Sequence, residues 1–233
     1  TLAGPITCTG ALILALLAGD ATGIAIGLSA ACLALSATGG TAERGVAIAI
    51  LGPVSGGAII AAASLAGQPV AFAGSAPIAL DTVRHGLLLL LALAGPGALI
   101  GLMPAHRWII RAHAAIPARA SAMLAGCVMP VALYVLIRLL LAPRIGETPP
   151  WLGVPPLILG TATAAWSAWR AAHEPELNAA LAGLAQRLAG LAVAGLGLTL
   201  IARSADLPDM AGLALSAVFV LVMALALCAT AAL

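Results

Sequence analysis

Residues 95–138 read GPGALIGLMPAHRWIIRAHAAIPARASAMLAGCVMPVALYVLIR, and this stretch decides the fold class. It begins in one apolar run, over residues 86–103, and ends in another, over residues 120–142. Each run has about the 20 residues that a helix needs to cross a hydrocarbon core of roughly 30 Å. Between them, residues 104–119 mix arginine and histidine with tryptophan and isoleucine. The pattern predicts two membrane helices and an amphipathic linker, which lies along the membrane interface or packs over the helix ends.

Apolar runs of similar length repeat on both sides of this stretch, separated by short polar segments. They predict an all-α transmembrane bundle of about eight helices. The predicted helices cover residues 2–19, 22–38, 45–66, 86–103, 120–142, 152–169, 184–202 and 210–233.

The composition supports this class. Of 233 residues, 63% are hydrophobic and 8% are charged, whereas a soluble domain has about 45–50% apolar and about 25% charged residues. We therefore expect a multi-pass integral membrane protein whose surroundings are the lipid bilayer. A formal net charge of +2 is too small to indicate a nucleic-acid partner.

Two of the predicted helices contain residues that interrupt a helix. Gly95, Gly97 and Gly101 surround Pro96 in one of them, and Pro130 lies in the next. Broken helices are tolerated at membrane depth where they line a cavity or are buried in protein. These residues predict two broken helices beside an interior polar path, or beside the remains of one.

Ionisable side chains are scarce in the predicted spans. All ten basic residues are arginine, and no Asp, Glu, Lys or His falls at the centre of a predicted span. Arg138 is near the end of its helix, so its guanidinium can reach the interface. Arg187 is expected to pair with Glu174 or Glu176. A proton relay needs titratable groups inside the membrane, and the residues alone do not supply one.

The linker carries the side chains that could bind a metal or act in catalysis. His106 and His113 are seven residues apart and share a face if the linker is helical, but no cysteine or carboxylate lies near them in the sequence. Ser121 and His113 could form a nucleophile–base pair, yet no carboxylate would orient the histidine. We predict no catalytic residue, no metal site and no cofactor. These side chains are expected to hold the linker against the helix ends.

The stretch quoted above resembles the signature of the antiporter-like membrane subunits of respiratory complex I, Mrp antiporters and hydrogenase-4-type complexes. Its glycine pattern and GLMP segment are most similar to the hydrogenase-4 branch. The matching residues are Gly95, Gly97, Gly101, Leu102, Pro104, His106, Trp108, Ala112, His113, Pro117, Ser121, Ala122, Gly126, Tyr134 and Arg138.

The resemblance implies an inverted-repeat core within a single transmembrane domain, residues 1–233. The first five-helix repeat would cover about residues 1–142, and a second repeat would start at about 152–233, so the chain would be part of a longer subunit. It also implies the bacterial inner membrane, other membrane subunits of a respiratory or hydrogenase-type complex as partners, and a proton path near His106, His113, Ser121 and Arg138.

The departures from the family pattern concern its charged channel groups. Ser29 aligns with the family's glutamate, and Leu99 aligns with the lysine that pairs with it. Pro130 and Asn178 align with two further lysines. The family mechanism rests on buried lysine and glutamate exchanging protons, so the resemblance implies a member that has lost these groups.

The expected function is therefore a membrane subunit whose inherited role is proton or cation translocation coupled to an oxidoreductase, at most a non-redox part of such an enzyme. Two alternatives remain open. The chain could be a structural scaffold that docks partner subunits without transport. It could also be a repurposed small-molecule transporter.

Overall fold

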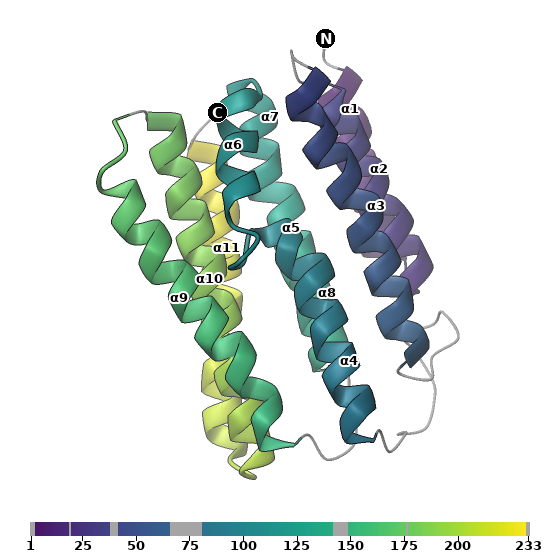
Figure 1. Cartoon of the computed structure of the whole chain (residues 1–233), viewed down its shortest axis with the longest axis vertical. Helices are drawn as coiled ribbons and strands as arrows, with labels where there is room; N and C mark the ends of the chain where they lie inside the picture. The colour runs from purple at the N-terminus through teal and green to yellow at the C-terminus, as the bar shows by residue number, and fades with distance from the viewer. Residues whose placement is uncertain are drawn as a thin grey trace.

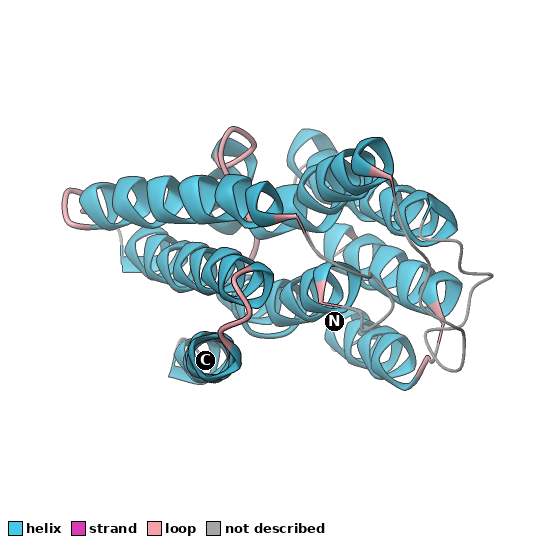
Figure 2. Cartoon of the chain, turned by 90° about the horizontal axis from the view of Figure 1, so that it is seen from below, coloured by secondary structure: helices cyan, strands magenta, loops and turns pink. Residues whose placement is uncertain are grey.

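The computed structural model describes residues 3–18, 20–37, 42–65, 81–141, 149–175 and 177–231. The regular structure of these residues consists of helices joined by loops, as Figure 2 shows. This confirms the predicted all-α class. The helices are α1 Ala3–Leu17, α2 Ala21–Ser36, α3 Ala42–Leu65, α4 Thr82–Ala92, α5 Ala98–Ile100, α6 Arg107–Ala115, α7 Ala118–Met123, α8 Met129–Leu140, α9 Val154–Ala171, α10 Leu177–Ser204 and α11 Pro208–Ala231. The π-helical segments η1 Leu93–Gly97 and η2 Leu124–Val128 and the 3-10 turn η3 Pro150–Gly153 connect some of them.

The helices form three groups that run along the long axis of the molecule (Figure 1). Helices α1–α3 lie on one side, α9–α11 lie on the other, and the segments from α4 to α8 stand between them. Within the outer groups, α2 packs on α1 and α3, and α10 packs on α9 and α11. The interrupted helices therefore occupy the centre of the bundle.

Several helices are long and apolar enough to cross a membrane. Among the described residues these are Thr82–Ile100, Arg119–Leu140, Ala179–Ser204 and Pro208–Leu227, and two shorter apolar helices cover Ala21–Ser36 and Ile48–Ser64. This agrees with the prediction of a multi-pass integral membrane protein. Each predicted helical segment overlaps a helix of the structure, although α10 begins earlier than the predicted 184–202.

The linker between the two central helices contains a short helix that packs inside the bundle. Residues 107–115 form α6, which packs against α3 and α10 rather than lying free along an interface. Ile109, Ile110 and Ala112 are buried, while Arg107 and Arg111 are exposed. The linker is thus amphipathic as predicted, and its apolar face completes the contact between the central and outer helices.

Small residues allow the outer helices to approach closely. A Cβ atom added to Gly160 of α9 would lie 2.5 Å from the backbone nitrogen of Ala194 and 2.6 Å from the carbonyl oxygen of Gly190, both in α10. In the other group, a Cβ on Gly52 of α3 would lie 2.6 Å from Cys32 Cβ of α2. Glycine at such contacts permits the short interhelical distances that are typical of membrane bundles.

Candidate functional site

The central feature of the bundle is a break in the chain between α5 and α6. The helix that starts at Thr82 continues through Pro96 as the π turn η1 and ends at Ile100. Gly101 then adopts φ +83°, a left-handed conformation that L side chains rarely tolerate. A Cβ on Gly101 would also lie 2.8 Å from Ile109 Cγ2. The true break thus spans residues 101–106, after the proline that the sequence marks as the interruption.

Three uncharged side chains bond to the backbone around this break. The indole Nε1 of Trp108 donates to the Ala98 carbonyl at 2.6 Å. From α10, Gln186 Nε2 donates to the Gly101 carbonyl at 2.7 Å, and from α9, Thr163 Oγ1 accepts from the Met103 amide at 3.0 Å. A helix end buried without such partners would leave polar backbone groups unpaired at a cost in stability. Side chains of α9 and α10 therefore hold the backbone of the break in place.

Gln186 and Thr163 are residues of this candidate site that the sequence interpretation missed. Both are buried, with 1% and 2% of their surface exposed. The signal that could have indicated Gln186 is a lone amide side chain inside the apolar run 184–202. Within the described residues, its Oε1 atom has no hydrogen-bond partner, so the amide brings a polar atom into the centre of the bundle.

The structure brings His113 and Ser121 together. His113 Nδ1 lies 2.6 Å from Ser121 Oγ, which joins α6 to α7. Helix α6 is not one of the membrane-spanning segments, and burial lowers the pKa of His113 to about 4. The imidazole is therefore neutral near pH 7. No carboxylate is seen to bond this pair among the described residues, so the contact offers a hydrogen bond between two helices rather than a catalytic relay.

His106 does not join this pair. It precedes α6, and its ring meets Trp166 of α9 edge-on, with 5.9 Å between the ring centroids. Within the described part of the chain, no group of three or more His, Cys, Asp or Glu side chains could hold a metal ion.

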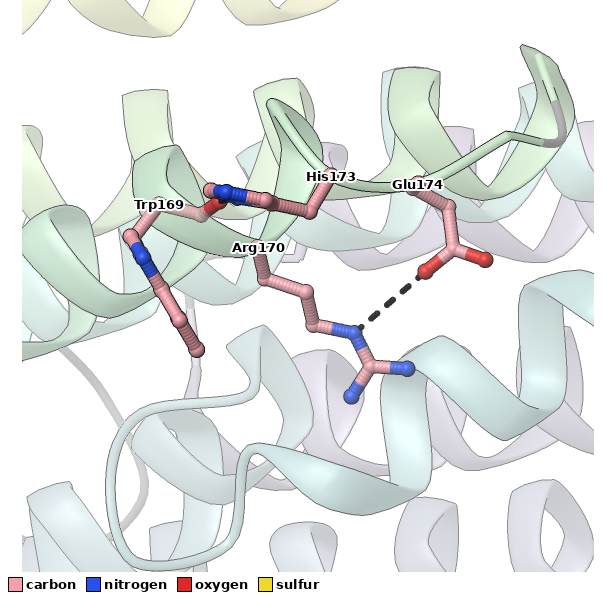
Figure 3. Close-up of polar contacts among 4 residues, drawn as sticks. All are labelled: Trp169, Arg170, His173 and Glu174. Atoms are coloured by element: carbon pink, nitrogen blue, oxygen red, sulfur yellow. Dashed lines mark hydrogen bonds and ion pairs between the residues drawn. The ribbon is translucent and has the colours of Figure 1, made fainter.

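A row of aromatic rings continues from Trp166 along the end of α9. The ring centroids of Trp166 and Trp169, and those of Trp169 and His173, are each 5.3 Å apart. His173 Nδ1 also lies 2.7 Å from the Trp169 carbonyl (Figure 3). Exposed tryptophans of this kind are enriched at membrane–water interfaces. Through the contact between His106 and Trp166, these rings connect the loop before α6 to this end of α9.

The ion pair next to this row differs from the predicted one. Glu174 pairs with Arg170 of α9, with 3.6 Å between Oε2 and Nε, and not with Arg187 (Figure 3). The two residues are four apart in sequence, so the helix turn places them side by side. Both side chains are partly exposed, and such a pair contributes less than about 1 kcal/mol to stability. Glu176, the other predicted partner, lies outside the described residues.

The second predicted interruption, at Pro130, does not stop its helix. The chain passes from α7 through the π turn η2 into α8, where Pro130 occupies the first turn. The π turn directly before Pro130 accommodates the backbone amide that proline lacks, so the helical segment continues. At the far end of α8, the half-buried Arg138 places its guanidinium carbon 5.7 Å from the centre of the Tyr134 ring.

The other positions that were predicted to align with the family's channel groups lie in different parts of the bundle. Ser29 is half-buried in α2 and donates to the Ala25 carbonyl at 2.6 Å and to the Gly52 carbonyl of α3 at 3.2 Å. Leu99 is fully buried in α5. Asn178 lies in the first turn of α10, and its side chain is outside the described residues.

Comparison with known proteins gives matches to membrane-complex subunits. Over 135 residues, 57% of its length, the chain is 28% identical to hydrogenase-4 component B of Escherichia coli. Over 126 residues, 54% of its length, it is 32% identical to formate hydrogenlyase subunit 3 of the same organism. Each match covers 20% of the relative, so the aligned segment spans about a fifth of these proteins.

The fold has a solved counterpart. A chain in the structure of the Mrp complex from Dietzia sp. DQ12-45-1b superposes with a TM-score of 0.71 at 20% sequence identity. The superposition covers 96% of this chain and 42% of the other. No family model matches the sequence. The shared fold therefore extends over nearly the whole chain.

Proposed function

We propose that this chain, which is a homologue of the antiporter-like membrane subunits of hydrogenase and Mrp complexes, works as a membrane subunit of a hydrogenase-4, complex I or Mrp-type complex. Its inherited role is proton or cation translocation coupled to an oxidoreductase. In this chain the lysine and glutamate groups of the channel are replaced, and the helical scaffold around them is kept.

One observation carries this proposal: neutral side chains hold the break at residues 101–106. Gln186 and Thr163 bond its backbone. Leu99, which the resemblance aligns with the family's lysine, is fully buried. A buried lysine can change its charge when its surroundings shift its pKa. A leucine side chain has no proton to exchange, so this alignment implies that the charged switch is missing beside the break.

The proposal extends to the surroundings of the chain. The bacterial inner membrane is the expected location, and other membrane subunits of a respiratory or hydrogenase-type complex are the expected partners. The first five-helix repeat would occupy about residues 1–142, and the second would start at about residue 152. The broken helix would thus belong to the first repeat, while Gln186 and Thr163 would reach it from the second.

Purification from the native membrane tests whether the chain assembles into such a complex. The tagged protein would be extracted in mild detergent, separated by size and analysed by mass spectrometry, next to an unrelated tagged membrane protein as control. We expect hydrogenase- or quinone-oxidoreductase-type subunits in a fixed ratio to this chain. A stable oligomer of this chain without them would contradict the proposal and favour a repurposed small-molecule transporter. Membrane subunits without redox subunits would favour a structural scaffold.

A further inference from the structure

A cavity of about 550 Å³ opens beside the broken helix, away from the hydrogen bonds that hold the break. One wall is the segment from Gly86 to Ala98, along α4, η1 and α5. The opposite wall comes from Trp151 of η3 and from Pro155 and Leu159 of α9, and the loop residues 102–105 also line the cavity. Every residue that lines the cavity is glycine, alanine, leucine, methionine, proline or tryptophan.

Two backbone groups of the lining residues already have hydrogen-bond partners within the protein. The Ala98 carbonyl already accepts from Trp108, and the Met103 amide already donates to Thr163. Apolar walls of this kind favour an apolar ligand over water. The chemistry of the walls therefore selects hydrocarbon.

The dimensions of the cavity match an extended hydrocarbon chain. The helical rise of 1.5 Å per residue makes the wall from Gly86 to Ala98 about 18 Å long. One leaflet of a bilayer has a hydrocarbon thickness of about 15 Å. If a methylene group takes about the space of a water molecule, roughly 30 Å³, the cavity holds about 18 carbon atoms. Both estimates describe one acyl chain lying parallel to the helices.

We propose that this cavity, named here the acyl-chain cavity, binds one acyl chain of a membrane phospholipid. The acyl chain enters beside Gly86 and Trp151, near the start of the span Thr82–Ile100. Its terminal methyl group reaches the loop at residues 102–105. Trp151 is 38% exposed, and an indole at the mouth suits the boundary between headgroups and hydrocarbon. The site does not depend on the function proposed above.

A helix of a partner subunit is the other apolar occupant that a membrane protein could receive. A helix of 10 Å diameter and 18 Å length has a volume of about 1,400 Å³, which is more than twice that of the cavity. A helix could cover the opening, but it could not enter. An acyl chain fits within the walls.

The test fills the cavity and measures the phospholipid that the protein retains. Ala94 lines the cavity and is exposed, so Ala94→Phe can place a ring there without disturbing the core. Leu159→Trp fills the cavity from the opposite wall. Ala165→Phe is the matched control, because Ala165 is an exposed residue of α9 that does not line the cavity. Each protein is purified in mild detergent, delipidated to constant phosphorus content and analysed by native mass spectrometry.

We expect the unmodified protein and Ala165→Phe to retain one phospholipid per chain. In Ala94→Phe and Leu159→Trp the retained phospholipid should fall about tenfold, since the added ring excludes several methylene groups from the cavity. Unchanged helicity by circular dichroism shows that the variants are folded. Equal retention in the filled variants and the control would overturn the proposal, and so would the absence of retained phospholipid from the unmodified protein. A lower yield of partner subunits with unchanged lipid would assign the opening to a partner helix and also overturn it.

Discussion

The substitution Gly160→Ala should lower the unfolding temperature of the protein by roughly 4–10 °C, which corresponds to a loss of about 2–3 kcal/mol. The methyl group would meet backbone atoms of α10, 2.5 Å from the Ala194 nitrogen and 2.6 Å from the Gly190 oxygen. Backbone atoms cannot turn aside as a flexible side chain can, so α9 and α10 must separate. Thermal unfolding in detergent, followed by circular dichroism, measures the change.

Gly57→Ala provides the matched control for this prediction. Gly57 also lies inside a helix, but no atom lies within 4 Å of a Cβ placed there. Alanine has a higher helix propensity than glycine, by up to about 1 kcal/mol, so this variant should be unchanged or slightly more stable. Equal unfolding temperatures for the two variants would show that α9 and α10 do not pack as closely as the structure has them.

The second large effect is expected at the break. Gln186→Leu keeps the size of the side chain but removes the only side-chain donor that is seen to bond the Gly101 carbonyl in the described residues. A buried carbonyl left unpaired costs about 1–3 kcal/mol. We expect a comparable loss of stability, and faster hydrogen exchange at residues 101–106, because the loop loses its link to α10. Thermal unfolding and hydrogen exchange with mass spectrometry check the two effects.

Thr199→Val is the control for the loss of a buried hydroxyl or amide in the same helix. Thr199 is as buried as Gln186, but its hydroxyl donates to Gly195 within α10 and holds no other element. We expect a smaller loss of stability and unchanged exchange at residues 101–106. If both variants changed the exchange of the loop equally, Gln186 would have no special part in holding the break.

Local sequence patterns were enough to predict the helices and the family. Apolar runs of membrane-spanning length predicted the helical segments. The motif from Gly95 to Arg138 indicated a resemblance to antiporter-like subunits, and the matches to hydrogenase-4 component B and formate hydrogenlyase subunit 3 agree with it. The hydrogen bond between His113 and Ser121 spans eight residues within that motif. Patterns of this length are visible in a sequence because the residues that interact are close along the chain.

The contacts that hold the break could not be predicted in the same way. Gln186 and Gly101 are 85 residues apart, and Thr163 and Met103 are 60 residues apart. No spacing rule connects such pairs, since packing of α9 and α10 on the central helices brings them together. The prolines also did not mark where the helices end, because Pro96 lies inside the π turn η1 and Pro130 follows the π turn η2. The roles of Ser29, Leu99, Pro130 and Asn178 as replaced channel positions stay predictions.

Proton flux into vesicles tests most directly the claim that this chain keeps the scaffold and has lost the charged proton path. The purified protein is reconstituted into vesicles with a pH-sensitive dye inside, and a potassium diffusion potential drives protons inward. Gramicidin added at the end shows that the dye responds and that the vesicles are sealed. We expect acidification no faster than in vesicles without protein, because neutral side chains stand at the break. Flux well above that of empty vesicles, in proportion to the amount of protein, would contradict the account.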